Sequence, residues 1–282
     1  MRHIEFIHNE HFENNYHRVA PPNALRHFID FFWETNFDSL WEKHPTGFSD
    51  AQFPNIGYTY IINLGNSFTM HVEDKPFKTK TDSFLPRYHA IECFHKPGNH
   101  LFGIKFRISP ILFEKKINFA EYRGQFYPLS YLLEQSVIDD LKKLKTFTAR
   151  VQYLSSYFIA QLKQQDASWQ AVHLVSQLLE DCYQQNNFSI SLENEAAKNK
   201  ITVRTLQRYF EACTGISSKK ALQVMRIRKA IMQIITAPDR FHYSTYGYYD
   251  YSHFHKSIKK FLTIGEQSSH LPILSLIQTI KT

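Results

Sequence analysis

The spacing of apolar and polar residues predicts a first part of the chain that is built mainly of strands. Residues 53–65 form a β-branched and aromatic run that ends in turn residues at Gly65, a composition typical of a strand. Further strand-like runs, separated by turn-forming residues, lie at 68–72, 83–93 and 101–108. Several short strands at this spacing indicate a β-barrel or a β-sandwich.

Helical spacing precedes and follows these strands. After Pro21-Pro22, apolar residues three or four positions apart predict a helix from Asn23 to Trp33; they are Leu25, Phe28, Ile29 and Phe32. The same spacing recurs from about 109 to 165. The polar run 164–168 is the expected domain boundary. Another apolar helix stripe follows it, made of Trp169, Val172, Val175, Leu178, Leu179 and Cys182.

The net charge of +7 is unevenly distributed. Residues 186–282 carry 14 Lys and Arg against 6 Asp and Glu, whereas the rest of the chain carries 19 against 20. All of the positive excess therefore lies in the C-terminal part, which favours a polyanionic partner for that part and a different role for the other. The same excess would also keep a domain soluble, so charge alone does not decide between the two interpretations.

Residues 191–210 have the pattern of two short helices joined by a tight turn. Ser191 and Thr202 stand where the two helices would be capped, and the small Ala196 permits a close crossing. Core positions at Leu206, Tyr209 and Phe210 leave a polar surface that consists of Arg204, Thr205, Gln207, Arg208 and Glu211. Arg pairs with guanine and Gln with adenine in a major groove, so this surface predicts base recognition. The alternative is an ordinary helix pair with a charged solvent face.

A long helix and a second unit follow. Ser217-Ser218 would cap a helix from Lys219 to Thr236, about 27 Å long. Its predicted inward residues are Leu222, Met225, Ala230, Ile231 and Ile234, and its mostly outward ones are Arg226, Arg228 and Lys229. A later helix has an apolar stripe at Phe254, Ile258 and Phe261 and a basic face at Lys256, Lys259 and Lys260. Two such units could reach successive major grooves, roughly 34 Å apart.

The segment from about 169 to 270 resembles the AraC/XylS-type DNA-binding domain. The resemblance rests on ordered patterns: Thr202-x-x-x-Leu206-x-Arg208-x-Phe210, Thr214-Gly215-Ile216-Ser217, Arg226-x-Arg228-x-Ala230 and Gly247-Tyr248-x-Asp250-x-Ser252-His253-Phe254. It implies two helix-turn-helix units bridged by a long helix, with DNA contacts from the second helix of each. By position these contacts are Arg204, Gln207 and Arg208, then Tyr251, Ser252, His255 and Lys256. Lys259 is expected to contact phosphate.

The chain also departs from the family pattern. Glu195 stands where the family usually has an apolar residue, and Lys200 where it favours Gly. Residues 241–246 replace the usual first helix of the second unit, so that bulky Tyr243 would take the place of Ala196. The closing motif is reduced to Gly265-Glu266-Gln267-Ser268. We therefore expect the second unit to read bases less sharply than the first and mostly to contact phosphate.

The strand-rich part resembles, at 53–65 and 102–106, the cupin-like N-terminal domain that family members often carry. This implies that it senses a small molecule or mediates dimerisation. Several side chains raise the alternative of a metal-binding cupin enzyme fused to a DNA-binding domain: His71, His89, His95, His100 and Glu92. The cupin motif needs two His one residue apart, and no His-x-His occurs. Other catalytic motifs are missing too. We expect no catalytic residue, metal site or cofactor.

The cysteines and the hydropathy pattern bear on the cellular compartment in which the protein is expected. Cys93, Cys182 and Cys213 are far apart and form no CxxC pair, which predicts buried or neutral thiols in a reducing cytoplasm. No apolar stretch reaches the roughly 18 residues of a membrane span, and the first residues lack the apolar core of a signal peptide.

The predicted fold class is α+β. It comprises a β-rich, cupin-like sensor or oligomerisation domain at 1–113, a helical connector at 114–167 and an all-α DNA-binding domain at 168–282. The predicted function is a cytoplasmic transcription regulator that binds double-stranded DNA. Candidate further partners are a small-molecule effector, RNA polymerase and a second copy of the chain. The remaining alternative is a protein-interaction module that has lost specific DNA binding.

Overall fold

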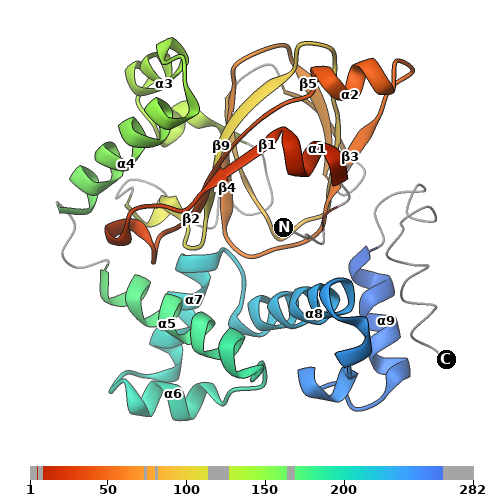
Figure 1. Ribbon diagram of the computed structural model, residues 1–282. Coiled ribbons are helices and arrows are strands. Elements are labelled where there is room, and N and C mark those ends of the chain that lie inside the picture. Colours follow the sequence, from red (N-terminus) through yellow and green to blue (C-terminus); the bar gives the residue numbers. More distant parts are fainter. Residues whose placement is uncertain are drawn as a thin grey trace.

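A computed structural model describes residue 5 and residues 9–72, 75–79, 82–113, 127–163 and 169–262. The strands gather in the N-terminal part, and every element described after residue 168 is a helix (Figure 1). This confirms the expected division into a β-rich part followed by a helical part. The expected boundary at 164–168 lies outside the described residues.

Two antiparallel sheets form the N-terminal part. The larger has the order β1 (Tyr16–Val19), β2 (Ile29–Asn36), β9 (His100–Phe106), β4 (Tyr58–Asn63), β7 (Ser83–Pro86) and β10 (Tyr127–Pro128). The smaller has the order β3 (Ser49–Gln52), β8 (Ile91–Phe94), β5 (Phe68–Val72) and β6 (Lys75–Thr79). Short helices α1 (Asn9–Asn14) and α2 (Asp38–Lys43) lie in the connections.

Strands β4, β7 and β9 of the larger sheet are buried on both faces, which explains their continuous apolar runs. Along β4, Ile61 points between the sheets, where it joins residues of the smaller sheet such as Met70 and Cys93. Its neighbours Tyr60 and Ile62 point the other way, into the core that the helices cover. There the ring of Tyr60 lies 4.6 Å from that of Phe106, which in turn lies 5.7 Å from Phe158.

The predicted helix from Asn23 to Trp33 is wrong. Only Asn23–Leu25 forms a 3-10 turn, η1, and the chain then enters β2, where Phe32 pairs with Ile104 of β9. The register shifts between Ile29 and Phe31. An irregularity of this kind breaks the period of two, so the buried residues on either side of it take on helix-like spacing.

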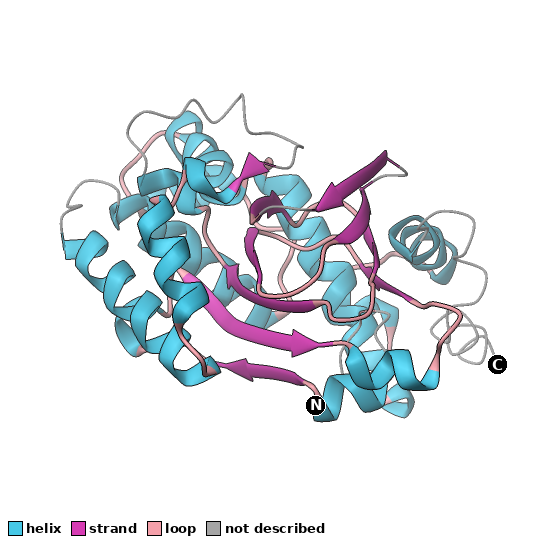
Figure 2. Cartoon of the chain, turned by 90° about the horizontal axis from the view of Figure 1, so that it is seen from above, coloured by secondary structure: helices cyan, strands magenta, loops and turns pink. Residues whose placement is uncertain are grey.

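The segment from 109 to 165 is helical over most of its described length, as expected, with one exception. It contains η2 (Pro110–Phe113), η3 (Leu129–Tyr131), α3 (Gln135–Lys143) and α4 (Phe147–Lys163), but β10 adds a strand to the larger sheet. Helix α4 covers the outer face of that sheet, and Figure 2 shows the helices arranged around the strands. Arg150 anchors it through a buried ion pair to Glu34 of β2, at 2.9 Å.

The helical part packs beneath the sheets (Figure 1). It consists of α5 (Trp169–Gln185), α6 (Leu192–Lys198), α7 (Val203–Thr214), α8 (Ser218–Thr236), η4 (Pro238–Arg240), η5 (Tyr243–Tyr246) and α9 (Tyr251–Leu262). One hydrophobic core runs from the outer face of the larger sheet through α4 into these helices. Among the helices that the structure describes, none is both long and apolar enough to cross a bilayer.

Candidate nucleic-acid interface

Helices α6 and α7 form the first predicted unit, and their ends have the expected caps. The Ser191 hydroxyl accepts a hydrogen bond from the backbone N–H of Asn194 at 3.2 Å, and the Thr202 hydroxyl accepts one from the backbone N–H of Thr205 at 3.1 Å. Ala196 is buried between the helices. Gly215 ends α7 with φ +77°, a conformation that favours glycine, and its amide donates to the Glu211 carbonyl at 2.8 Å.

One face of α7 is polar and exposed, and the opposite face is buried. Leu206 and Phe210 have no exposed surface. Arg204, Gln207 and Arg208 are exposed, three and four positions apart, so they share one face. Thr205 is half-buried, and its hydroxyl lies 2.9 Å from that of Thr202. Thr205 therefore belongs to the cap rather than to the exposed surface.

Two of the departures from the family pattern lie in this first unit, Glu195 within α6 and Lys200 in the turn that follows it. Lys200 has φ +54°, in the left-handed region where a glycine would be unstrained. Glu195 is half-buried on α6, and its carboxylate lies 3.8 Å from the Lys198 ammonium. The turn keeps its geometry with both residues, at a cost in backbone strain at Lys200.

Helix α8 connects the two units and is capped by Ser217, whose hydroxyl accepts from the Lys220 amide. The predicted inward residues are confirmed as buried: Leu222, Met225, Ala230, Ile231 and Ile234. The prediction that three basic residues point mostly outward is wrong; Arg226, Arg228 and Lys229 are all half-buried. They are held by partners far away in the sequence, which helical periodicity does not encode.

Each of these three cations has its own partner. The Arg226 guanidinium lies over the Tyr248 ring, 4.2 Å from its centroid, and the Lys229 ammonium lies 4.4 Å from the centroid of Tyr183. Arg228 donates to the carbonyls of Phe53 and Pro54, at 3.2 and 3.0 Å. Cation–π contacts and carbonyl bonds of this kind offset the cost of partial burial.

The second unit differs from the first in its opening segment. Instead of an α-helix, residues 243–246 form the 3-10 turn η5. Tyr243 is half-buried, and Tyr246 and Tyr248 fill the interior. The rings of Phe241 and Tyr246 stack at 5.9 Å. Two helices can cross closely only where small residues lie between them. The several large rings of this short segment need more room, which is consistent with the loss of the regular helix.

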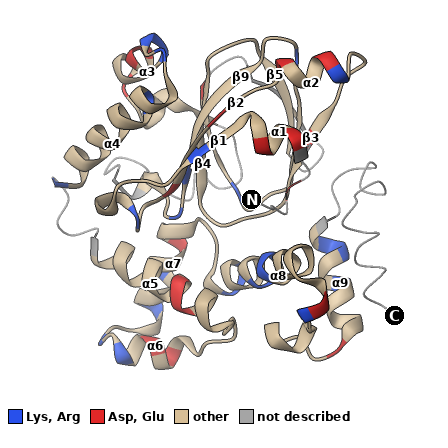
Figure 3. Cartoon of the chain, viewed as in Figure 1, with Lys and Arg blue, Asp and Glu red and all other residues tan. Residues whose placement is uncertain are grey.

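Helix α9 presents the second set of predicted contact residues. Phe254, Ile258 and Phe261 are buried, as expected. On its other side Ser252, Lys256 and Lys259 are exposed, whereas Tyr251 and His255 are half-buried, with rings 6.0 Å apart. The Asp250 carboxylate caps the helix by accepting from the His253 amide at 2.6 Å. Basic positions recur along α8 and α9 (Figure 3).

The helical part is docked on the β-rich part by contacts that the sequence patterns did not reveal. The Ser109 amide donates to the Cys213 carbonyl at the end of α7, at 2.6 Å. A Cβ atom at Gly215 would collide with the Tyr58 hydroxyl, so the two parts lie in close contact there. Near α9, the rings of Phe53 and Phe261 lie 5.7 Å apart.

The histidines that raised a metal alternative are dispersed. His71 pairs across strands with Glu92, whereas His95 stacks on Phe37 at 3.5 Å and contacts Asp50 at 3.2 Å. His100 lies 3.0 Å from Glu34. Within the described ranges, no group of three or more His, Cys, Asp or Glu could hold a metal ion.

The three thiols are buried, as expected. Burial, reinforced by nearby carboxylates such as Glu195, raises the pKa of Cys182 to about 11. Burial also raises the pKa of Cys93 and Cys213. A thiol with a raised pKa is mostly protonated at neutral pH and a poor nucleophile.

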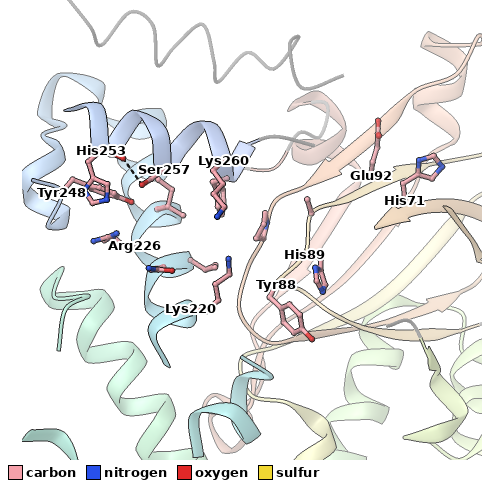
Figure 4. A pocket seen from close by; sticks show the side chains of 16 residues that line it. His71, Tyr88, His89, Glu92, Lys220, Arg226, Tyr248, His253, Ser257 and Lys260 are labelled. Carbon is pink, nitrogen blue, oxygen red and sulfur yellow. Dashed lines mark hydrogen bonds between the residues drawn. The ribbon is translucent and has the colours of Figure 1, made fainter. Parts of the chain in front are cut away.

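Three cavities bear on ligand binding. The space between the two sheets, lined by Trp33, Thr59 and Arg87 among others, is only about 20 Å³. Two larger cavities lie between the β-rich part and the helices. One, of about 500 Å³, is bounded by α8, α9 and residues 88–92 (Figure 4). The other, of about 410 Å³, is bounded by α5, α8 and the end of β9.

Comparisons with known proteins give structural neighbours only. No family model matches the chain, and no curated protein matches it either. Among solved structures, a 1.65 Å structure of ToxT from Vibrio cholerae is similar over 93% of this chain and 96% of that one, with 12% identity and a TM-score of 0.41. ToxT bound to (E)-4-(8-methylnaphthalen-1-yl)but-3-enoic acid covers 95% of this chain and 98% of its own, at 11% identity and a TM-score of 0.40.

Proposed function

We propose that this protein is a transcription regulator whose helical part reads double-stranded DNA. The observation that carries the proposal is the polar face of α7. A well-capped helix presents Arg204, Gln207 and Arg208 to solvent in its first turns, while Leu206 and Phe210 fix its other face in the core. Arg forms bidentate hydrogen bonds with the edge of guanine, and Gln forms them with the edge of adenine.

The order of elements supports the same proposal. The patterns that resemble the AraC/XylS-type domain fall on the cap and body of α7, the junction with α8, the middle of α8 and the start of α9. Helix α8 has 19 residues and is therefore roughly 28 Å long. A spacer of that length suits two units that contact successive major grooves, roughly 34 Å apart.

The β-rich part is assigned the controlling role in this proposal. A small-molecule effector, or contact with a second copy of the chain, would change how α7 and α9 are presented to DNA, and RNA polymerase would be a further partner. The assigned divisions are 1–113 for sensing or oligomerisation, 114–167 for the connector and 168–282 for DNA binding. The enzyme alternative needs an activated thiol or a metal cluster, and the protonated state of the three thiols speaks against the first.

The experiment that tests this function separates base contacts from phosphate contacts in the full chain. After selection of a preferred DNA site, Gln207→Ala and Arg208→Ala should each weaken binding to it by roughly 1–3 kcal/mol and leave binding to random DNA almost unchanged. Lys259→Ala should weaken both alike and reduce the salt dependence, because a phosphate contact carries no sequence information.

Lys142→Ala is the matched control. Lys142 lies on α3, where it pairs with Asp82 at 2.7 Å, away from α7 and α9. Its removal should leave DNA binding unchanged. Equal losses on selected and random DNA for Gln207→Ala, Arg208→Ala and Lys259→Ala would show that the roles are wrongly assigned. Failure to bind DNA even at low salt would overturn the function itself.

A further inference from the structure

The larger cavity between the two parts has the size of a small-molecule site. Its volume of about 500 Å³ falls within the range of roughly 300–1,000 Å³ typical of ligand pockets. One wall comes from α8 and α9, and the other comes from His71 of β5, Glu92 of β8 and the loop before β8 (Figure 4). The space between the sheets is far smaller, so a ligand of ordinary size would not fit there.

The lining of this cavity is strongly basic. Lys220 and Arg226 of α8 and Lys260 of α9 all line it, together with three histidines. The one carboxylate in the lining is Glu92, which already accepts a hydrogen bond from the Ser49 hydroxyl at 2.9 Å. Over the described ranges, none of the three Lys and Arg side chains forms an ion pair.

The second cavity has a lining whose positive charge is partly neutralised by carboxylates. Its basic residues are Lys105, Arg107, Arg228 and Lys229, and the carboxylates of Asp30 and Glu180 line the same space. Arg107 pairs with both, at 3.2 and 3.3 Å, and Arg228 pairs with Glu5. Lys105 and Lys229 in the second cavity donate to backbone carbonyls instead. In the cavity of Figure 4, by contrast, none of the three Lys and Arg side chains is paired with a described carboxylate.

Arg226 is held in place for a ligand. Its guanidinium stacks on the ring of Tyr248, which is buried. This contact restrains the guanidinium, and its buried Nε atom has no hydrogen-bond partner among the described residues. A buried donor of this kind costs free energy until an acceptor reaches it.

We propose that this cavity binds a small molecule with two or more negative charges, a phosphate ester or a polycarboxylate, through Lys220, Arg226 and Lys260. Two flexible ammonium groups and one fixed, planar guanidinium suit several anionic oxygens spread over one ligand. The aromatic side chains of Tyr88 and Phe261 in the lining provide apolar contact for the rest of the molecule.

Binding at this place would couple the ligand to the geometry of the helices. The end of α7 is fixed to the β-rich part by the Ser109–Cys213 hydrogen bond, whereas α9 borders the cavity and touches that part through the rings of Phe261 and Phe53. Lys260 of α9 lines the cavity, and both Lys259 next to it and Lys256 one turn earlier are exposed. An anion that draws α9 toward strands β5 and β8 therefore shifts α9 relative to α7. This consequence rests on the proposed function, but binding itself does not.

Calorimetric titration of the full chain at physiological ionic strength tests the binding. Sodium pyrophosphate and sodium citrate are the probes for the two ligand types, and sodium acetate is the singly charged control. We expect saturable 1:1 binding of pyrophosphate or citrate and none of acetate. Lys220→Gln and Lys260→Gln should each weaken binding about tenfold, because each removes a charge-assisted hydrogen bond. The probe that binds more tightly shows whether the site prefers phosphate groups or carboxylates.

Arg107→Gln in the second cavity is the matched control, and it should leave the affinity unchanged. The proposal is overturned if neither pyrophosphate nor citrate binds, or if the Lys220→Gln and Lys260→Gln variants bind them as tightly as the wild type does. DNA binding without added anion is measured in parallel. If these two variants lose DNA affinity and keep anion affinity, the two lysines contact DNA phosphate and the ligand site does not exist.

Discussion

Arg228 of α8 and Glu5, which precedes it by 223 residues, form an ion pair with 2.5 Å between Nη2 and Oε1. Both side chains are mostly buried, at 17% and 15% exposure. Glu5 also accepts a hydrogen bond from the Phe53 amide at 2.7 Å. The pair thus joins the start of the chain, the loop after β3 and the helix that bridges the two predicted DNA-binding units.

Removal of the Glu5 charge should destabilise the chain in a pH-dependent way. Burial raises the pKa of Glu5, but attraction by Arg228 and Arg87 outweighs it, so the pKa is lowered from 4.5. The pair therefore stabilises the folded chain fully above pH 4.5, and this stabilisation is lost as the pH falls through the lowered pKa of Glu5. At pH 7, Glu5→Gln should reduce the free energy of unfolding by about 3 kcal/mol, because it leaves Arg228 buried without its counter-charge.

Urea unfolding at neutral and acidic pH measures this effect, and the gap between variant and wild type should narrow in acid. Lys43→Gln is the control, since it breaks the Lys43–Glu10 pair, in which both side chains are exposed. Solvent screens such a pair, so its loss should scarcely change stability. A Glu5→Gln variant as stable as the wild type would contradict the structural role of the pair.

Lys200→Gly should stabilise the chain by roughly 0.5–1 kcal/mol, because φ +54° costs a residue with a Cβ atom more than it costs glycine. Lys198→Gly, two residues earlier in helix α6, should destabilise by a similar amount. Thermal unfolding of both variants checks the opposite signs. A loss of stability in both would show that the turn does not strain Lys200.

Lys105 should make stability depend on pH in the alkaline range. Burial lowers its pKa from 10.5 to about 7, although the ammonium donates to the carbonyls of Ile56 and Phe106. Between these two values the unfolded chain binds more protons than the folded one, so stability rises with pH. Lys105→Met should lose this rise. Urea unfolding at neutral pH and near pH 10 compares the slopes, and equal slopes in variant and wild type would refute the assignment.

The second unit should contribute less sequence specificity than the first. Its opening segment is the 3-10 turn η5, and Tyr246 occupies the interior in place of a close helix crossing. Footprinting with single-base substitutions across the bound site measures the contribution of each half. We expect substitutions in the half that α9 contacts to be better tolerated. Equal intolerance in both halves would show that the aromatic packing restores a full reading geometry.

Local chemistry determined the helical part of this protein. The caps at Ser191, Thr202 and Ser217 and the left-handed stop at Gly215 act on neighbouring backbone groups. Amphipathic spacing fixes which side of each helix is buried, so Leu206 and Phe210 were assigned correctly, as were Phe254 and Ile258. These features depend on residues within a few positions of one another, and for that reason the sequence alone reveals them.

Tertiary structure decided what local patterns leave open. The region from Ile29 to Trp33 has helix-like spacing, yet pairing with β1 and β9 makes it a strand. Arg228 was expected to point outward from α8, but it bonds to Glu5 and to the carbonyls of Phe53 and Pro54 at the boundary between the two parts. The basic cavity likewise needs α8, α9 and the strands β5 and β8 together. Such contacts join residues as many as 223 positions apart. No period along the chain encodes them, because they arise only when both partners are folded.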